Sequence, residues 1–237
     1  MKLNKIKINN NIFKLYFKKG VFVPTATTGF LISNFLKINK KIKNKKILDL
    51  GCGSGIIAIA LANSLNKNTF YGSDLSENSL ICCKKNFNKF KIVGEVKKGN
   101  MFKPWNGYKF DFIINDISGI SSILAKKSKW FQNIPSSSGL DGSKITIQVI
   151  KNCSKYLNKK GKLYLPLISL SNCNKILNFA KRKFKKTRIV SENKWFLPDD
   201  LAKYQNLLFK MKAKKQISFD YKFGKFICYT KILELKN

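Results

Sequence analysis

The stretch ILDLGCGSGIIAIALA, residues 47–62, carries the strongest structural signal in the chain. An apolar strand runs into Gly51, Gly53 and Gly55, and the pattern predicts an apolar helix from Ser54 onward. Glycine at such a turn lets a ligand approach the backbone closely, because no Cβ intervenes. Free N–H groups at the start of the helix attract a carboxylate or a phosphate. The stretch therefore predicts a ligand-binding turn between a buried strand and a helix.

The spacing of these glycines differs from that of a nicotinamide dinucleotide site. The dinucleotide fingerprint G-x-G-x-x-G requires a glycine at position 56, where Ile56 stands instead. The spacing present is G-x-G-x-G, preceded by Asp49. A simpler interpretation is that the glycines only make a tight turn and that nearby acids are solvated strand ends.

Strand and helix patterns alternate from Lys46 to the C-terminus, which predicts an α/β fold with a mostly parallel sheet covered by helices on both faces. We expect seven strands in this sheet. Residues 1–42 are predicted to form an N-terminal hairpin and helix extension, and residues 43–237 the main domain. Strands are expected at residues 46–51, 68–74, 95–100, 110–116, 162–168, 186–196 and 226–235, and helices at 27–36, 54–65, 76–87, 143–157 and 171–184.

Composition excludes several kinds of site. The chain contains no histidine, and its six cysteines form no C-x-x-C pair, so a His-dependent triad is excluded and no metal site is expected. No apolar run approaches the roughly 20 residues that span a bilayer, and the N-terminus lacks the apolar core of a signal peptide. We therefore expect a cytoplasmic protein without membrane contact. The sequence indicates no oligomeric state.

The formal net charge of +35 has two interpretations. Clustered basic residues neutralise phosphates, so polyanions are expected to be attracted at least non-specifically. However, Arg182 and Arg188 are the only arginines among 47 basic residues, and arginine is the better reader of bases and phosphates. The lysine, asparagine and isoleucine bias is typical of an AT-rich genome. Charge alone therefore does not establish a nucleic-acid partner.

The LDLGCGSG segment resembles the first motif of class I S-adenosylmethionine-dependent methyltransferases. Two further segments, YGSDLS and KKGNMF, occur in the order that this family shows at successive strand ends. The resemblance implies a Rossmann-like fold, a methyltransferase activity and S-adenosyl-L-methionine as the cofactor. It implies that Asp74 accepts both ribose hydroxyls, and that Asn100, which replaces the family's acid, pairs with adenine. The cofactor-binding residues implied in this way are Asp49, Gly51, Cys52, Gly53, Gly55, Asp74, Leu75, Asn100, Met101, Asn115 and Thr28. Cys52 is expected to fill the loop without acting as a nucleophile.

The segments VFVPTATTGFLISNFL and SSSGLDGSKITIQVI resemble the small-domain methyltransferases, which include release-factor glutamine and ribosomal RNA guanine enzymes. Pro24 and Thr28 match that group's VFxPRxET segment. Those enzymes carry N-P-P-Y after the fourth strand, whereas this chain has Asn115, Asp116, Ile117 and Ser118. The rigid stacking platform for a flat nitrogen is therefore missing, and a carboxylate is gained.

Asn115, Asp116 and Ser118 are the candidate catalytic residues. Asp116 is expected to orient a substrate amine or hydroxyl or to accept its proton, although it is also interpretable as a solvated strand-end acid. Ser118 is expected either to donate to the same group or to cap the following helix.

Two loops near this edge remain open to interpretation. Residues 134–139 form either a lid or an ordinary surface loop. Trp195 and Phe196 are expected mostly to pack in the core, with a substrate wall as the alternative.

The sequence therefore favours a methyltransferase that acts on a nitrogen or oxygen nucleophile of an unidentified small molecule, RNA or protein. An RNA or protein-glutamine methyltransferase, an NAD-dependent oxidoreductase and a non-catalytic nucleoside-binding protein are the alternatives.

Overall fold

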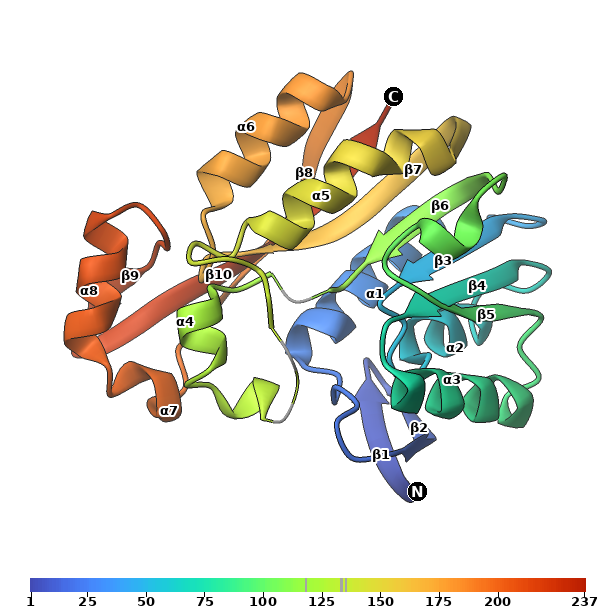
Figure 1. The fold of residues 1–237 in the computed structure, drawn as a ribbon, viewed down its shortest axis with the longest axis horizontal. Coiled ribbons are helices and arrows are strands. Elements are labelled where there is room, and N and C mark those ends of the chain that lie inside the picture. Colours follow the sequence, from blue (N-terminus) through green and yellow to red (C-terminus); the bar gives the residue numbers. More distant parts are fainter. Residues whose placement is uncertain (118, 133, 135) are drawn as a thin grey trace.

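The central sheet organises the chain, and its strand order in the computed structural model is β5-β4-β3-β6-β7-β10-β8, with β9 paired to β10 (Figure 1). The structure describes residues 1–117, 119–132, 134 and 136–237. Strands β5, β4, β3, β6 and β7 are mutually parallel, and β10 is antiparallel to β7, β8 and β9. The strands are β3 (Lys46–Leu50), β4 (Thr69–Asp74), β5 (Gly94–Lys98), β6 (Phe110–Asn115), β7 (Leu157–Ile168), β8 (Lys186–Phe196), β9 (Asp220–Lys222) and β10 (Lys225–Lys236). The expected α/β fold is confirmed, with the short β9 as an additional strand.

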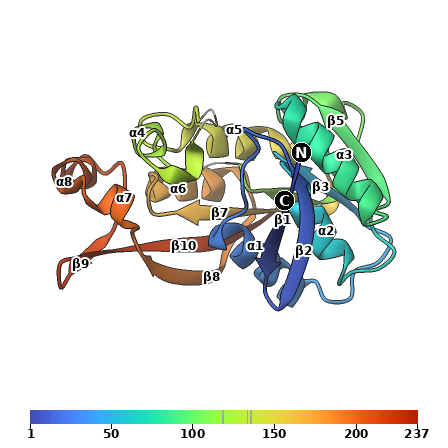
Figure 2. The same ribbon diagram turned by 90° about the horizontal axis from the view of Figure 1, so that it is seen from below.

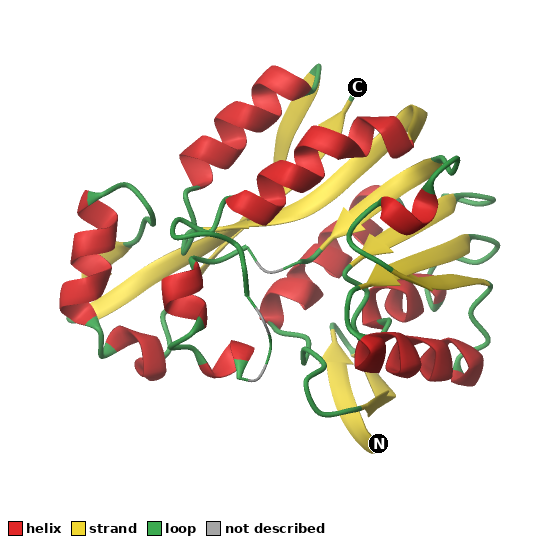
Figure 3. Cartoon of the chain, viewed as in Figure 1, coloured by secondary structure: helices red, strands yellow, loops and turns green. Residues whose placement is uncertain are grey.

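Helices cover both faces of the sheet (Figures 2 and 3). One face packs against α1 (Ala26–Ile38), α2 (Ile56–Ala62) and α3 (Glu77–Lys89), and the other against α5 (Lys144–Cys153) and α6 (Cys173–Lys183). Alternation along β3 divides its side chains between the faces: Ile47 lies in the first core, and Leu48 and Leu50 lie in the second. Burial on both faces explains why this strand is apolar almost throughout.

The N-terminal hairpin of β1 (Lys2–Ile8) and β2 (Asn11–Phe17) packs into the same core as α1, α2 and α3. Asn9 adopts a positive φ of 53° in the turn of the hairpin, a conformation that asparagine tolerates. Asn86 of α3 joins the hairpin to the glycine turn, because its amide donates to Tyr16 O at 3.1 Å and to Ser54 O at 2.9 Å.

A third apolar cluster forms the C-terminal part of the molecule. It joins α4 (Ser122–Ala125), α7 (Asp199–Ala202), α8 (Gln205–Ala213) and the β9–β10 hairpin. Helices α4, α7 and α8 and strand β9 were not predicted from the sequence. The described residues also form three short 3₁₀ helices, namely η1 (Lys103–Trp105), η2 (Lys129–Phe131) and η3 (Ser154–Tyr156).

Three sequence expectations were wrong in detail. Helix α1 begins at Ala26, one residue before the predicted start at residue 27, with Thr25 at its N-cap. Helix α2 begins at Ile56 rather than Ser54, because Gly55 occupies the N-cap in a left-handed conformation. Phe196 is 62% exposed and does not pack in the core, because it lies at the end of the edge strand β8. In contrast, the predicted start of the helix at residue 76 is confirmed, because Ser76 is the N-cap of α3 and accepts a hydrogen bond from Ser79 N.

Candidate active site

The candidate residues gather at the carboxyl edge of the parallel strands. In the strand register Leu50 lies beside both Ser73 and Asn115, and Asp74 lies beside Lys98. The turns that follow β3, β4, β5 and β6 therefore meet at one edge of the sheet. This edge is where open α/β sheets bind their ligands.

The glycine turn folds back against the end of β4. Gly51 N and Cys52 N both donate to Ser73 O, at 2.8 and 3.1 Å, and Gly53 N donates to Asp74 Oδ2 at 3.0 Å. Gly51 and Gly53 have φ values of 71° and 52°, which side-chain-bearing residues rarely adopt. A Cβ at Gly53 would meet no atom within 4 Å, so the turn leaves open space beside its backbone.

Asp74 is fixed in position by two backbone donors. Its Oδ2 accepts from Gly53 N and its Oδ1 accepts from Ser76 N at 2.8 Å. Each carboxylate oxygen has a second lone pair, so Asp74 retains two acceptor positions for a ligand. The partly exposed carboxylate is therefore held rigidly with capacity to accept hydroxyl donors.

Three buried polar groups near the turn lack hydrogen-bond partners among the described residues. They are both carboxylate oxygens of Asp49, Ser54 Oγ and Asn115 Oδ1, and each residue is at most 2% exposed. Burial, together with the charges of Asp116 and Asp74, raises the pKa of Asp49 well above its usual range. Because orphaned buried acceptors cost free energy, they indicate that the site is built for a ligand that donates hydrogen bonds or carries positive charge.

Asp116 lies just after β6 and contacts helix α1. Thr28 Oγ1 donates to Asp116 Oδ2 at 2.6 Å, which joins the N-terminal segment to the catalytic edge. Burial raises the pKa of Asp116 to about 6, although the Thr28 hydrogen bond opposes this rise. Near neutral pH the carboxyl group is therefore able both to hold and to release a proton.

Asp49, Asp74 and Asp116 place three carboxyl groups around the glycine turn of a chain whose net charge is +35. Acidic side chains thus gather at the glycine turn although the chain as a whole is basic. This arrangement fits a cationic ligand, and a sulfonium nucleoside carries a positive charge. No group of three or more potential metal-binding side chains was found in the described part of the chain.

The other predicted cofactor residues occupy varied environments. Met101 is half-buried, and its carbonyl accepts from Ser73 Oγ at 3.0 Å. Asn100 and Leu75 are exposed at the same edge. The Cys83 thiol and burial raise the pKa of Cys52 well above its usual range, which makes Cys52 a poor nucleophile. Ser118 lies outside the described residues.

Comparison with known proteins finds a family that resembles the first half of the chain. Residues 13–116 match the family "Methyltransferase small domain". The chain is 30% identical over 105 residues to the release factor glutamine methyltransferase of Fusobacterium nucleatum, covering 44% of this chain and 30% of that protein. It is 34% identical over 107 residues to the protein of the same name from Aquifex aeolicus, covering 44% and 37%. Residues 13–116 are therefore similar to the small-domain group of class I methyltransferases. The match spans about a third of the length of each of these two relatives.

Solved methyltransferases share the fold of this chain. A T. thermophilus 16S rRNA methyltransferase, solved with AdoMet and guanosine, has a TM-score of 0.65 at 13% identity, covering 100% of this chain and 50% of its own. A methyltransferase from Pyrococcus furiosus has a TM-score of 0.54 at 14% identity, covering 92% and 88%. At these identities the likeness concerns the fold.

The structure assigns contacts at this candidate site to two features for which the sequence analysis gave no role. Ile117 packs on the glycine turn, and a Cβ at Gly51 would lie 2.6 Å from Ile117 Cγ1. The Gly139–Gly142 segment supports the loop after β6, since Ser121 Oγ donates to Leu140 O at 2.6 Å and Ser122 N to Gly139 O at 2.9 Å. The resemblance of SSSGLDGSKITIQVI to the small-domain methyltransferases was the available signal for this segment, whereas the sequence indicated no contact between Ile117 and the glycine turn.

Among the described residues, no helix has both the length and the apolar character needed to cross a membrane.

Proposed function

We propose that this protein is an S-adenosyl-L-methionine-dependent methyltransferase that acts on a nitrogen or oxygen nucleophile. The observation that supports this proposal most directly is the orphaned, fully buried carboxylate of Asp49 beside the glycine turn. S-adenosylmethionine carries an ammonium and a sulfonium, so it supplies both the donors and the positive charge that the pocket lacks. The similarity of residues 13–116 to the small-domain methyltransferases supports the same cofactor.

Each residue then has a defined role. Asp74, held by Gly53 N and Ser76 N, accepts the two ribose hydroxyls. The open space at Gly53 admits the cofactor against the backbone. Asp49 faces its positively charged methionine end, and Asn115 offers an unpaired buried oxygen at the same edge. Asn100 and Met101 lie where the adenine is expected.

The bound cofactor supplies a methyl group on a good leaving group, so the protein contributes mainly position and desolvation. Bound S-adenosylmethionine would supply an electrophilic methyl group, with the bonding electrons left on a neutral thioether. Asp116 accepts the proton of the nucleophile, and Thr28 fixes the orientation of its carboxylate.

The substrate is the less determined part of this proposal. The curated relatives are named as release factor glutamine methyltransferases and a structural neighbour as a 16S rRNA methyltransferase, so a protein and an RNA both deserve testing. The replacement of P-P-Y removes the stacking platform for a flat amide, which weakens the case for glutamine as the target.

Calorimetric titration tests the cofactor assignment. S-adenosylmethionine and S-adenosylhomocysteine are expected to bind and NAD is not, because Ile56 replaces the third glycine of a dinucleotide site. Binding of NAD alone would overturn the proposal. Incubation with radiolabelled S-adenosylmethionine and separate RNA, protein and small-molecule fractions then identifies the substrate class.

A further inference from the structure

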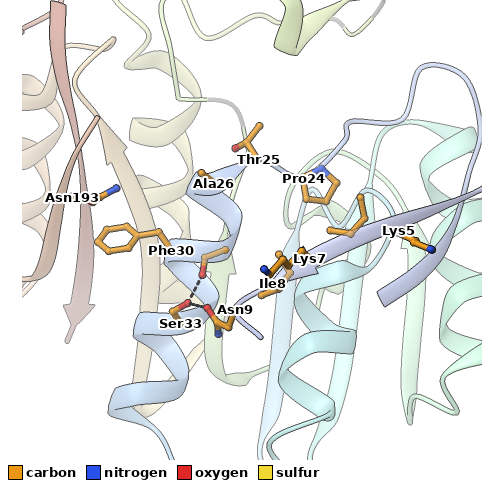
Figure 4. Close-up of a pocket in the computed structure, with 12 residues that line it drawn as sticks. Lys5, Lys7, Ile8, Asn9, Pro24, Thr25, Ala26, Phe30, Ser33 and Asn193 are labelled. Carbon is orange, nitrogen blue, oxygen red and sulfur yellow. Dashed lines mark hydrogen bonds between the residues drawn. The ribbon is translucent and has the colours of Figure 1, made fainter. Parts of the chain in front are cut away.

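A groove of about 640 Å³ lies on the outer face of α1, and we call it the α1 groove. The first two turns of α1 form its floor, from Thr25 to Ser33. Strand β1 forms one wall with Lys5 and Lys7, and Asn193 of β8 stands on the other side (Figure 4). The groove therefore joins three elements that are far apart in the sequence.

The α1 groove carries positive charge. Its lining contains two lysines and no carboxylate, and both lysines are exposed. Among the described residues, no carboxylate forms a salt bridge with Lys5 or Lys7. Residues 1–48 as a whole contain twelve lysines and no aspartate or glutamate. Residues 142–191 are likewise free of aspartate and glutamate, so the evidence for an anionic ligand comes from the lining of the groove and not from the composition of this segment.

Within the hairpin, like charges face each other. Lys5 of β1 pairs directly with Lys14 of β2, and both side chains are exposed. Like charges at directly opposed positions of an antiparallel pair destabilise it. Such a pair is relieved when an anion lies against the strands, and a phosphodiester backbone supplies repeated anionic groups.

The floor and far wall of the groove offer contacts for bases and sugars. Phe30 is half-buried, and its ring extends from α1 toward Asn193 (Figure 4). Aromatic side chains in a positively charged groove stack the bases of single-stranded nucleic acid. Asn193 and Ser33 add amide and hydroxyl groups, which hydrogen-bond with the 2′-hydroxyl that distinguishes RNA.

The α1 groove also leads to the candidate catalytic edge. Thr25, at its upper end in Figure 4, precedes Thr28 by three residues, which is about one helical turn. The hydroxyl of Thr28 holds Asp116 from the inner side of the same helix. A strand bound along the groove therefore has its next nucleotide within reach of the site.

We propose that the α1 groove binds single-stranded RNA next to the nucleotide that this enzyme methylates. Lys5 and Lys7 contact phosphates and Phe30 stacks a base. This inference rests on the proposed methyltransferase function and names RNA as its substrate class. An acidic protein segment is the competing occupant, but it offers fewer regularly spaced anions and no base to stack on Phe30.

The test uses the full chain and a fluorescein-labelled twelve-nucleotide oligouridylate, with anisotropy measured from 50 to 300 mM KCl. For single strands each phosphate contact contributes about 0.7 to the slope of log K against log salt. Lys5→Ala/Lys7→Ala should therefore lower the slope by about 1.4, which at 0.1 M salt corresponds to about 25-fold weaker binding. Phe30→Leu keeps the apolar packing of α1 and should weaken binding by about fivefold, with the slope unchanged.

The matched control is Lys210→Ala/Lys214→Ala, which removes two exposed lysines at α8, in a different part of the molecule. If both double variants lose affinity and slope equally, general charge attraction explains binding and the proposal is wrong. It is also wrong if a polyglutamate peptide, rather than the RNA, competes for the groove in a Lys5-dependent manner. Titration of every variant with S-adenosylmethionine shows whether the variant is folded. The same titration separates the two proposals, because a wild-type protein that does not bind S-adenosylmethionine refutes the methyltransferase assignment and leaves the RNA-binding test unaffected.

Discussion

Asp116→Asn is expected to stabilise the protein near neutral pH while it removes the candidate proton acceptor. Burial raises the pKa of Asp116 to about 6, whereas the unfolded value is about 3.9. The folded chain therefore holds a proton at this group that the unfolded chain has released. The contribution of Asp116 to the free energy of unfolding is complete below about pH 4 and is lost as the pH rises through about 6.

The cost of ionised Asp116 follows from the difference between its folded and unfolded pKa values. A difference of about two pKa units means that ionisation of Asp116 lowers the free energy of unfolding by about 3 kcal/mol well above pH 6 and by about 1 kcal/mol at pH 4.5. Because Asp116 is partly exposed, solvent screening reduces the cost at neutral pH to about 2 kcal/mol. For a chain of this size, removing that cost should raise the melting temperature by about 4–8 °C at pH 7.5 and by less than about 3 °C at pH 4.5.

Differential scanning calorimetry of wild type and Asp116→Asn at both pH values makes the measurement. Asp141→Asn is the matched control, because folding lowers the pKa of Asp141 whereas it raises the pKa of Asp116. Burial favours the neutral form of Asp141, but hydrogen bonds from Ser143 and Lys175 outweigh it and lower its pKa. This control should lose stability at pH 7.5. An Asp116 variant that is no more stable than wild type at pH 7.5, or equally stabilised at both pH values, would refute the reasoning.

Three further substitutions probe the site. Thr28→Val removes the hydrogen-bond donor to Asp116 and should raise the pKa of that carboxyl by about one unit. In calorimetry over a pH series, the pH range in which the melting temperature falls should then move up by about one unit. Asp74→Ala should weaken S-adenosylmethionine binding about tenfold in a titration, and unchanged affinity would mean that the ribose lies elsewhere. Gly53→Ala and Gly107→Ala carry similar backbone strain, because both glycines have positive φ and open space beside them. Of these two, only Gly53→Ala should abolish cofactor binding, and equal effects on binding would show that strain alone is responsible.

Periodicity and glycine placement were sufficient to predict the layered fold. Several correct predictions depend only on neighbouring residues, namely the apolar runs at β3 and β6 and the start of α3 at Ser76. Such local patterns can be recognised in the sequence without knowledge of the fold. Helices α7 and α8 were missed, because neither has the long amphipathic period that identifies a helix in a sequence. The start of α1 was misplaced because three threonines, Thr25, Thr27 and Thr28, compete for the cap in the sequence.

The candidate site was predicted as a set of residues but not as a set of contacts. Motif order placed Asp49, Asp74 and Asn115 at one sheet edge, since parallel strands end together. The contact between Thr28 and Asp116 joins residues 88 positions apart, and no local pattern reports it. Likewise, the position of Ile117 over Gly51 depends on the turn after β6. The roles of these residues toward a cofactor stay predictions.

The most direct test of the whole interpretation is a crystal structure of the protein grown with S-adenosylhomocysteine. We expect the nucleoside to lie against Gly51 and Gly53, with its sugar hydroxyls on Asp74 and its amino group near Asp49. A ligand bound elsewhere, or a turn that Ile117 keeps closed to it, would contradict the assignment.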